Sequence, residues 1–145
     1  MSIDETDYKI LEILQKDARI PFTVVGRELG ISDATVHVRV KRMLKEGIIK
    51  RYTIAVNEEV LGRNVFGFVL LNVTPGNLED VVKYLLENEH ISAIYEIHGP
   101  NDLILKIWAE NLDEMRDKML EIREVPNVTT SELITIYKVW KERDY

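Results

Sequence analysis

The chain has 145 residues, of which 46% are hydrophobic and 30% are charged, and it contains no cysteine. This composition is typical of a globular protein with one or two small domains, and it excludes disulfides and thiolate metal sites. The longest apolar run, residues 65–71, is too short to span a bilayer, and residues 1–5 do not resemble a signal peptide. We therefore expect a cytoplasmic protein without a membrane partner.

The net charge of −6 is unevenly distributed along the chain. Residues 1–55 carry ten Lys/Arg and eight Asp/Glu, whereas residues 56–145 carry nine and seventeen. Within residues 32–51, six basic residues stand against two acidic ones. A local positive charge on an otherwise acidic protein indicates two modules with different partners, the first of which suits an anion such as DNA.

Apolar spacing and capping residues predict three helices in the first fifty residues. Asp4 can cap the first helix with its carboxylate. Pro21 ends that pattern, Thr23 can cap a short second helix, and Gly30 can end it in a left-handed conformation. Gly26 falls inside the second helix, which we explain by close approach of the third helix. The inward-facing residues expected in the first helix are Ile10, Leu11, Leu14 and Ala18.

The third helix, together with the short turn before it, predicts a helix-turn-helix. Ser32 can cap it, Val36, Val40 and Met43 form its core stripe, and extended chain is expected over residues 48–54. Short or polar side chains then face outward near its N-terminus and basic ones further along, as reading base edges and neutralising phosphates requires. The alternative is a three-helix unit with an ordinary basic surface. The predicted DNA-binding residues are Ser32, Asp33, Ala34, Thr35, His37, Val38, Arg39, Lys41, Arg42 and Lys50.

From residue 65 onward the pattern predicts a strand–helix–strand order that occurs twice. The expected strands are residues 65–74, 92–98, 103–109 and 129–139. The expected helices begin at Asn77 and at Asn111, the second with a capping box completed by Glu114. Their predicted inward residues are Leu78, Val81, Val82, Leu85 and Leu86, then Leu112, Met115, Met119 and Ile122. This order is that of a ferredoxin-like βαββαβ domain, so the whole chain is expected to be α+β.

The first of these strands is apolar on both of its faces. Phe66, Phe68 and Leu70 alternate with Val65, Val69 and Leu71. Because the helices of a ferredoxin-like domain cover only one face of the sheet, something else must cover the other face. Self-association is the simplest possibility, and a homodimer would also give the two-fold symmetry with which helix-turn-helix proteins read paired half-sites.

Two other classes of function are alternatives to DNA binding. Glu96, His98 and Asp102 could lie together, but nothing completes a metal site, and the sequence has no nucleophile motif and no phosphate-binding loop. We therefore predict no catalytic residue, no metal and no cofactor. The second alternative is an effector-binding or protein-interaction module with little specific affinity for DNA, which a salt titration of duplex binding would distinguish.

Several of these motifs resemble one known family. Asp4-Glu5-x-Asp7 with Ile10-Leu11-x-x-Leu14, then Gly30-Ile31-Ser32-x-x-Thr35-Val36-x-x-Arg39-Val40 and Gly47-Ile48-Ile49, resemble the DNA-binding domain of the Lrp/AsnC (feast/famine) transcription regulators. Gly99-x-x-Asp102 and Pro126-x-Val128 resemble the RAM domain of the same family. The family's turn more often carries a charged and an aromatic residue where this chain has Pro100 and Asn101. The resemblance is in the correct order and covers nearly the whole chain.

This resemblance implies a winged helix-turn-helix in residues 1–51, a hinge strand and linker in residues 52–63, and a RAM domain in residues 64–145. It implies a sequence-specific transcription regulator that forms homodimers and can assemble into octamers. It also implies a small effector, usually an amino acid, bound between RAM domains. Asp102 could accept from its ammonium group, and backbone N–H groups or hydroxyls could donate to its carboxylate. The alternative for Asp102 is a turn residue that caps its own backbone. The expected effector-binding residues are Gly99, Pro100, Asn101, Asp102, Thr130 and Ser131.

Overall fold

The computed structural model describes residues 3–142, which form two compact units, residues 3–55 and 56–142. The expected end of the second domain at residue 145 lies outside the described residues. Among the residues described, no helix is long and apolar enough to cross a membrane.

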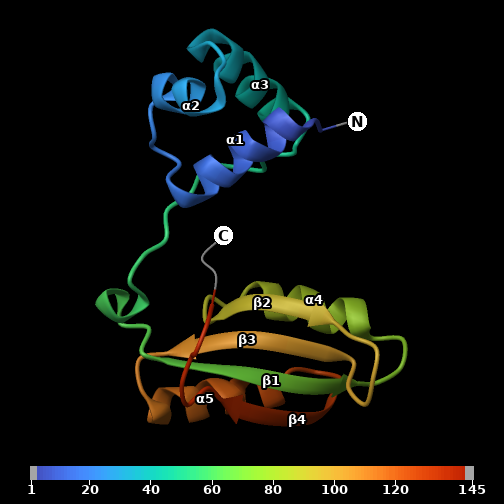
Figure 1. Ribbon diagram of the computed structural model, residues 1–145. Coiled ribbons are helices and arrows are strands. Elements are labelled where there is room, and N and C mark those ends of the chain that lie inside the picture. The colour runs from blue at the N-terminus through green and yellow to red at the C-terminus, as the bar shows by residue number, and fades with distance from the viewer. Residues whose placement is uncertain (1–2, 143–145) are drawn as a thin grey trace. The chain divides into compact units, whose positions relative to one another are not determined.

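The first unit consists of three helices, α1 (Glu5–Lys16), α2 (Phe22–Leu29) and α3 (Asp33–Lys45) (Figure 1). The three helices form one apolar core because each contributes a stripe of side chains at helical spacing. The buried residues of this core are Ile10, Leu14, Val25, Val36, Val40 and Met43. The three inward-facing positions predicted for α3 are therefore confirmed.

The ends of α1 and α2 match the sequence-based predictions at Asp4 but differ from them at Ala18 and Thr23. The Asp4 carboxylate accepts from the Asp7 N–H at 2.8 Å, which confirms the predicted cap of α1. Ala18 is exposed and lies beyond the end of α1, so its inclusion in the core stripe was wrong. The cap predicted at Thr23 was also wrong. Pro21 occupies the N-cap position, and α2 has no side-chain cap.

The α2–α3 turn depends on two glycines. Gly30 has φ 68°, the left-handed conformation predicted for the end of α2. A Cβ on Gly26 would lie 2.7 Å from the Ile31 carbonyl oxygen and 3.3 Å from the Asp33 backbone nitrogen. The close approach predicted at Gly26 is thus confirmed, and the atoms that approach are backbone atoms of the turn and of the start of α3.

The segment after α3 does not form a strand between residues 46 and 57. Ile48 and Ile49 instead pack against the core of the first unit, and both of their N–H groups donate to the Met43 carbonyl oxygen. Extended chain was predicted over residues 48–54, but Ile48 and Ile49 lie in a bend, and residues 50–54 belong to no helix or strand. The wing of the helix-turn-helix is therefore a segment without strand pairing.

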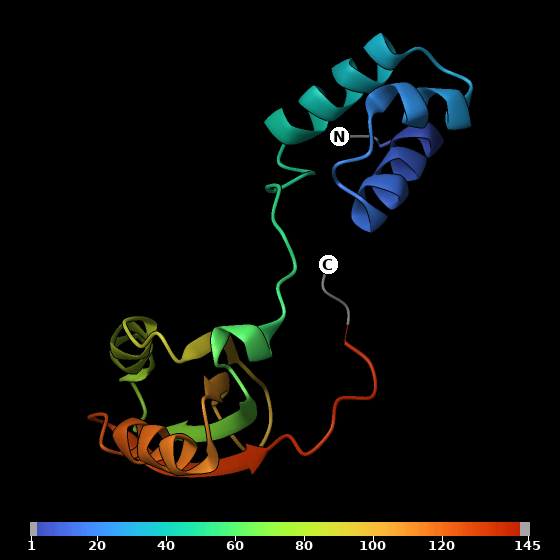
Figure 2. The ribbon, with the colours of Figure 1, turned by 90° about the vertical axis from the view of Figure 1, so that its left-hand side faces the viewer.

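The second unit begins with a short 3-10 helix, η1 (Glu58–Leu61), and contains a four-stranded antiparallel sheet with two helices. The strands lie in the order β2-β3-β1-β4, which is the ferredoxin-like order. Both helices lie on the same side of the sheet (Figures 1 and 2). The elements in chain order are β1 (Val65–Val73), α4 (Leu78–Leu86), β2 (Ile91–Glu96), β3 (Leu103–Ala109), α5 (Leu112–Arg123) and β4 (Val128–Thr135).

Several details of the second unit correct the sequence-based expectations. β4 ends at Thr135 rather than 139, and β2 ends at Glu96 rather than 98. The Asn111 side chain caps α5 by accepting from the Glu114 N–H at 2.9 Å, but the Asn77 side chain does not cap α4. Leu86 and Leu112, both predicted to face inward, have exposed fractions of 66% and 65% because they lie at helix ends.

The two faces of the sheet are in different environments. On the helix-covered face, Val69, Leu71, Leu105 and Ile107 are fully buried against residues of α4 and α5. On the open face, every side chain is only partly buried or exposed. Cross-strand partners on that face include Phe66 with Trp108, Phe68 with Ile134, and Leu70 with Ile104. The predicted apolar character of both faces of β1 is therefore confirmed.

Candidate DNA-binding surface and effector site

The outward side of α3 carries most of the residues predicted to bind DNA. Ser32, Asp33, Ala34, His37, Val38, Lys41 and Lys50 are exposed, and Val38 has an exposed fraction of 69%. The Ser32 and Thr35 hydroxyls lie 2.7 Å apart, and Ser32 also caps the helix. The His37 ring packs edge-on against Phe22 of α2, with centroids 4.6 Å apart, so contacts from α2 fix its position. The residues of this set that belong to α3 are thus short or polar near its N-terminus, and the basic Lys41 follows further along.

Arg39 and Arg42, also predicted to bind DNA, face the N-terminus of α1 instead. Arg39 Nη1 lies 2.6 Å from an Asp4 carboxylate oxygen and 2.9 Å from Asp7 Oδ1. Arg42 Nη2 pairs with Asp7 Oδ2. The Asp7 side chain is fully buried, whereas both arginines are partly exposed. The positive charge of these two residues is therefore balanced within the protein.

The ionisation of this cluster follows from its geometry. Burial raises the pKa of Asp7, but hydrogen bonds from Arg39, from the Asp4 N–H and from Arg42 outweigh it and leave the pKa below 3.8. The hydrogen bond from Arg39 likewise lowers the pKa of Asp4. The same two carboxylates raise the pKa of Arg39. Asp4, Asp7 and Arg39 are thus charged at neutral pH.

The sequence did not predict that Asp4 and Asp7 pair with Arg39 and Arg42 of α3. The one available signal was their spacing, because Asp4 and Asp7 are three residues apart, as are Arg39 and Arg42. Such a spacing places both members of a pair on one side of a helix. It does not say which two helices meet.

The predicted effector turn lies at the end of β1. The Asp102 carboxylate accepts from the Val73 N–H at 2.8 Å, and the Asp102 N–H donates to the Leu71 carbonyl oxygen at 2.9 Å. Gly99 and Pro100 are exposed, and Asn101 is partly buried. The Asp102 side chain thus connects the start of β3 to the end of β1 through one of its two carboxylate oxygens.

Thr130 and Ser131, the other predicted effector residues, lie on opposite faces of β4. Thr130 is paired with Asn72, whose side-chain amide donates to its hydroxyl at 3.0 Å on the open face. Ser131 is paired with Leu71, whose side chain is buried on the helix-covered face. Because successive side chains in a strand alternate between faces, these two hydroxyls cannot hold the same ligand group within one chain.

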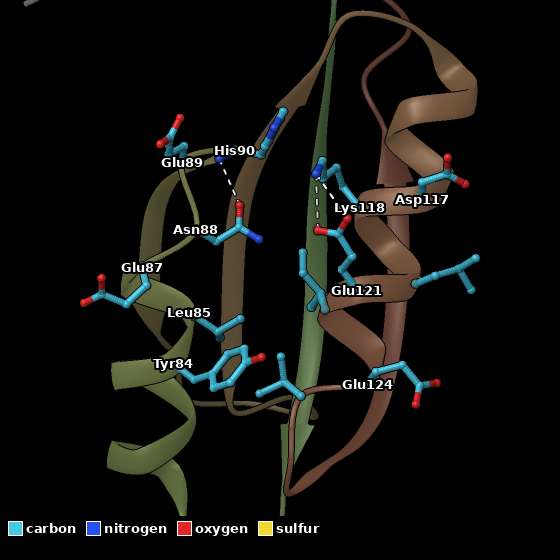
Figure 3. A pocket seen from close by; sticks show the side chains of 13 residues that line it. Tyr84, Leu85, Glu87, Asn88, Glu89, His90, Asp117, Lys118, Glu121 and Glu124 are labelled. Carbon is cyan, nitrogen blue, oxygen red and sulfur yellow. Dashed lines mark hydrogen bonds and ion pairs between the residues drawn. The ribbon is translucent and has the colours of Figure 1, made fainter.

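A groove of the second unit lies elsewhere, between α4 and α5 (Figure 3). It has a volume of about 990 Å³ and a floor that includes Leu85, Ile122 and Val125. Its one lysine, Lys118, is held by Glu121 at 3.1 Å. Five carboxylates line it, from Glu87, Glu89, Asp117, Glu121 and Glu124. A ligand carboxylate would be repelled there, so this groove does not suit a free amino acid.

Residues 3–142 contain no group of three His, Cys, Asp or Glu side chains placed to hold a metal ion.

A helix-turn-helix with an exposed polar reading surface, followed in one chain by a ferredoxin-like domain, is the architecture of a DNA-binding transcription regulator with a ligand-binding domain. Comparison with known protein families assigns the same two functions to the two parts of the chain. Residues 3–50 match the family described as winged helix-turn-helix DNA-binding, and residues 67–145 match the Lrp/AsnC ligand binding domain. The chain belongs to the Lrp/AsnC family and is a DNA-binding transcription regulator.

Individual relatives agree with this assignment. The HTH-type transcriptional regulator FL11 of Pyrococcus furiosus is 34% identical over 140 residues, which cover 97% of this chain and 93% of the relative. The structure of E. coli AsnC matches all of this chain and 99% of its own, with a TM-score of 0.95 and 23% identity. A Neisseria meningitidis transcriptional regulator, whose structure is a complex with L-Met, matches 99% of this chain and 95% of its own, with a TM-score of 0.93 and 18% identity. FL11 and the N. meningitidis relative are both named as transcriptional regulators.

Proposed function

We propose that this regulator acts as a homodimer that reads DNA through α3 and responds to a free amino acid. The observation that carries the proposal is the occurrence in one chain of an exposed helix-turn-helix surface and a sheet with an uncovered apolar face. Dimeric helix-turn-helix proteins read paired half-sites, and pairing of two chains through the uncovered face would place two reading helices for such sites.

The assignment of DNA contacts follows from position on α3. Ala34, Thr35, His37 and Val38 lie near the N-terminal end of the helix, where short side chains reach base edges. Lys41 and Lys50 are exposed and, within residues 3–142, form no ion pair of the kind that holds Arg39 and Arg42. We assign base reading to the first group and phosphate contacts to the two lysines. The cytoplasm is where such a regulator would meet DNA.

The assignment of the dimer interface follows from the open face of the sheet. Phe66, Phe68, Leu70, Ile104 and Trp108 are partly exposed there and form a continuous apolar surface across β1 and β3. Covering this surface with the same surface of a second chain would remove it from water, which is favourable by about 25 cal/mol per Å² of apolar area. We also propose that such dimers can assemble further into octamers.

The effector assignment rests on Asp102 and its turn. The turn is exposed at Gly99 and Pro100 and partly buried at Asn101 and Asp102, lies at an end of the sheet, and carries a carboxylate with an oxygen not used in the bond to Val73. A carboxylate suits the ammonium group of an amino acid. We assign the turn residues 99–102 and the open-face hydroxyl of Thr130 to the effector site. The N. meningitidis relative in complex with L-Met supports the choice of an amino acid as the ligand class.

The experiment that tests the proposal is selection of duplexes from a random pool by the full chain, repeated with and without a mixture of the twenty amino acids. We expect an enriched motif with two-fold symmetry, whose spacing or affinity changes with the mixture. No enrichment at low salt would refute sequence-specific binding. An enriched motif that ignores all twenty amino acids would refute the effector assignment alone.

A further inference from the structure

The N-terminus of α1 and the middle of α3 form a four-residue charge cluster. Asp7 accepts from Arg39 Nη1 at 2.9 Å, from Arg42 Nη2, and from the Asp4 N–H at 3.1 Å. Asp4 accepts from the same Arg39 nitrogen at 2.6 Å. Two carboxylates therefore balance two guanidinium groups, and the cluster has no net charge.

The orientation of Arg42 indicates that Asp7 holds it. Arg42 Nε is buried and has no hydrogen-bond partner within residues 3–142. A buried unpaired donor costs free energy, so the contact between Arg42 Nη2 and Asp7 must outweigh that loss. Asp7, with no exposed surface, is itself fixed by the Asp4 N–H and by Arg39.

The cluster borders the surface assigned to DNA. Asp4, Arg39 and Arg42 line a hollow of about 430 Å³, together with Ala34, Thr35 and Val38 of the reading surface. An arginine in this place would ordinarily bind DNA phosphates. Such a contact forms with any base sequence, because phosphates carry no sequence information. Here the arginine's charge is already neutralised by a carboxylate of the same domain.

We propose that Asp7 is a positioning residue for DNA recognition. With Asp4 it holds the Arg39 and Arg42 guanidinium groups against α1, and it so weakens the sequence-independent binding of the protein to DNA phosphates. The inference rests on the proposed assignment of α3 as the reading helix. It separates the basic residues of α3 into two kinds. Lys41 contributes to affinity, whereas Arg39 and Arg42 fix the reading helix and leave sequence preference to its other side chains.

The test is the salt dependence of binding to a selected duplex and to a random duplex, measured by fluorescence anisotropy on the full chain. We expect Asp7→Asn to raise affinity for the random duplex. It should also steepen the dependence of log K on log salt by about 0.9 for each freed guanidinium group that reaches a phosphate. The ratio of selected to random affinity should fall. The charge-balanced double variant Asp7→Asn/Arg42→Gln should return the slope toward wild type.

The matched control is Glu5→Gln, which makes the same change of charge on the same helix. Glu5 pairs with Lys9 at 2.7 Å and has no contact with α3 among its ion pairs. We expect its salt dependence and its affinity ratio to equal those of the wild type.

Two results would overturn the inference. Asp7→Asn with the wild-type slope and ratio would leave Asp7 without a role in recognition. A shallower slope with weaker binding to both duplexes would mean that the arginines contact phosphates in the positions that Asp7 gives them. If circular dichroism finds Asp7→Asn unfolded, Asp4→Asn replaces it, because Asn caps a helix as well as Asp, and a smaller change in the same direction is expected. A wild-type chain that binds no duplex would refute the proposed function instead.

Discussion

Substitution of Gly26 by alanine tests the packing of the helix-turn-helix through the sign of its effect. In an ordinary helix interior this change stabilises by about 1 kcal/mol, because glycine has the larger entropy loss on folding. Here the added methyl would lie 2.7 Å from the Ile31 carbonyl oxygen and 3.3 Å from the Asp33 nitrogen. Since these are backbone atoms that cannot rotate away, we place the overpacking cost at about 3 kcal/mol. The expected net effect is a destabilisation of about 2 kcal/mol.

Hydrogen exchange of the full chain measures this destabilisation separately in the first unit, residues 3–55. A loss of about 2 kcal/mol lowers protection of the amides of α2 and α3 roughly thirtyfold. Peptides from β1 and β3 serve as an internal reference and should not change. Arg27→Ala, at the exposed neighbouring position, is the matched control, and its effect should stay within about 0.5 kcal/mol. Increased protection of α2 and α3 in Gly26→Ala would refute the argument from close packing.

Three further outcomes are expected. Phe68→Glu should dissociate the proposed dimer in sedimentation experiments, because it places a charge on the open face, whereas Tyr84→Glu on α4 should not. Asp102→Asn should remove the amino-acid-dependent rise in melting temperature and keep the acceptor for the Val73 N–H, and an undiminished rise would exclude Asp102 from the site. The lowered pKa values of Asp4 and Asp7 mean that the cluster contributes its full stability above pH 3.8. That contribution is lost as the pH falls from 3.8 through the native pKa values. Acid titration followed by hydrogen exchange of α1 would detect this loss. Asp4→Asn should weaken the dependence of α1 protection on pH.

Local features were predictable because their causes are local. The cap at Asp4, the left-handed Gly30 and the stripe Val36, Val40 and Met43 each depend on residues within one or two helical turns. The bounds of β3 agree with the expected residues 103–109, since a strand between two turns is limited by its own sequence. The predictions for Ala18 and Leu86 failed because apolar spacing does not show where a helix ends.

The sequence alone determined the order of helices and strands, and with it the α+β class, the helix-turn-helix and the apolar character of both faces of β1. Only the tertiary structure decided which charges meet. Arg39 and Arg42 lie more than thirty residues from Asp7, and their pairing depends on how α1 packs across α3. It also decided that Thr130 and Ser131 point to opposite faces, because that depends on the register of β4 with β1. Contacts between distant segments are set by packing and register, which the spacing of residues within one element does not contain.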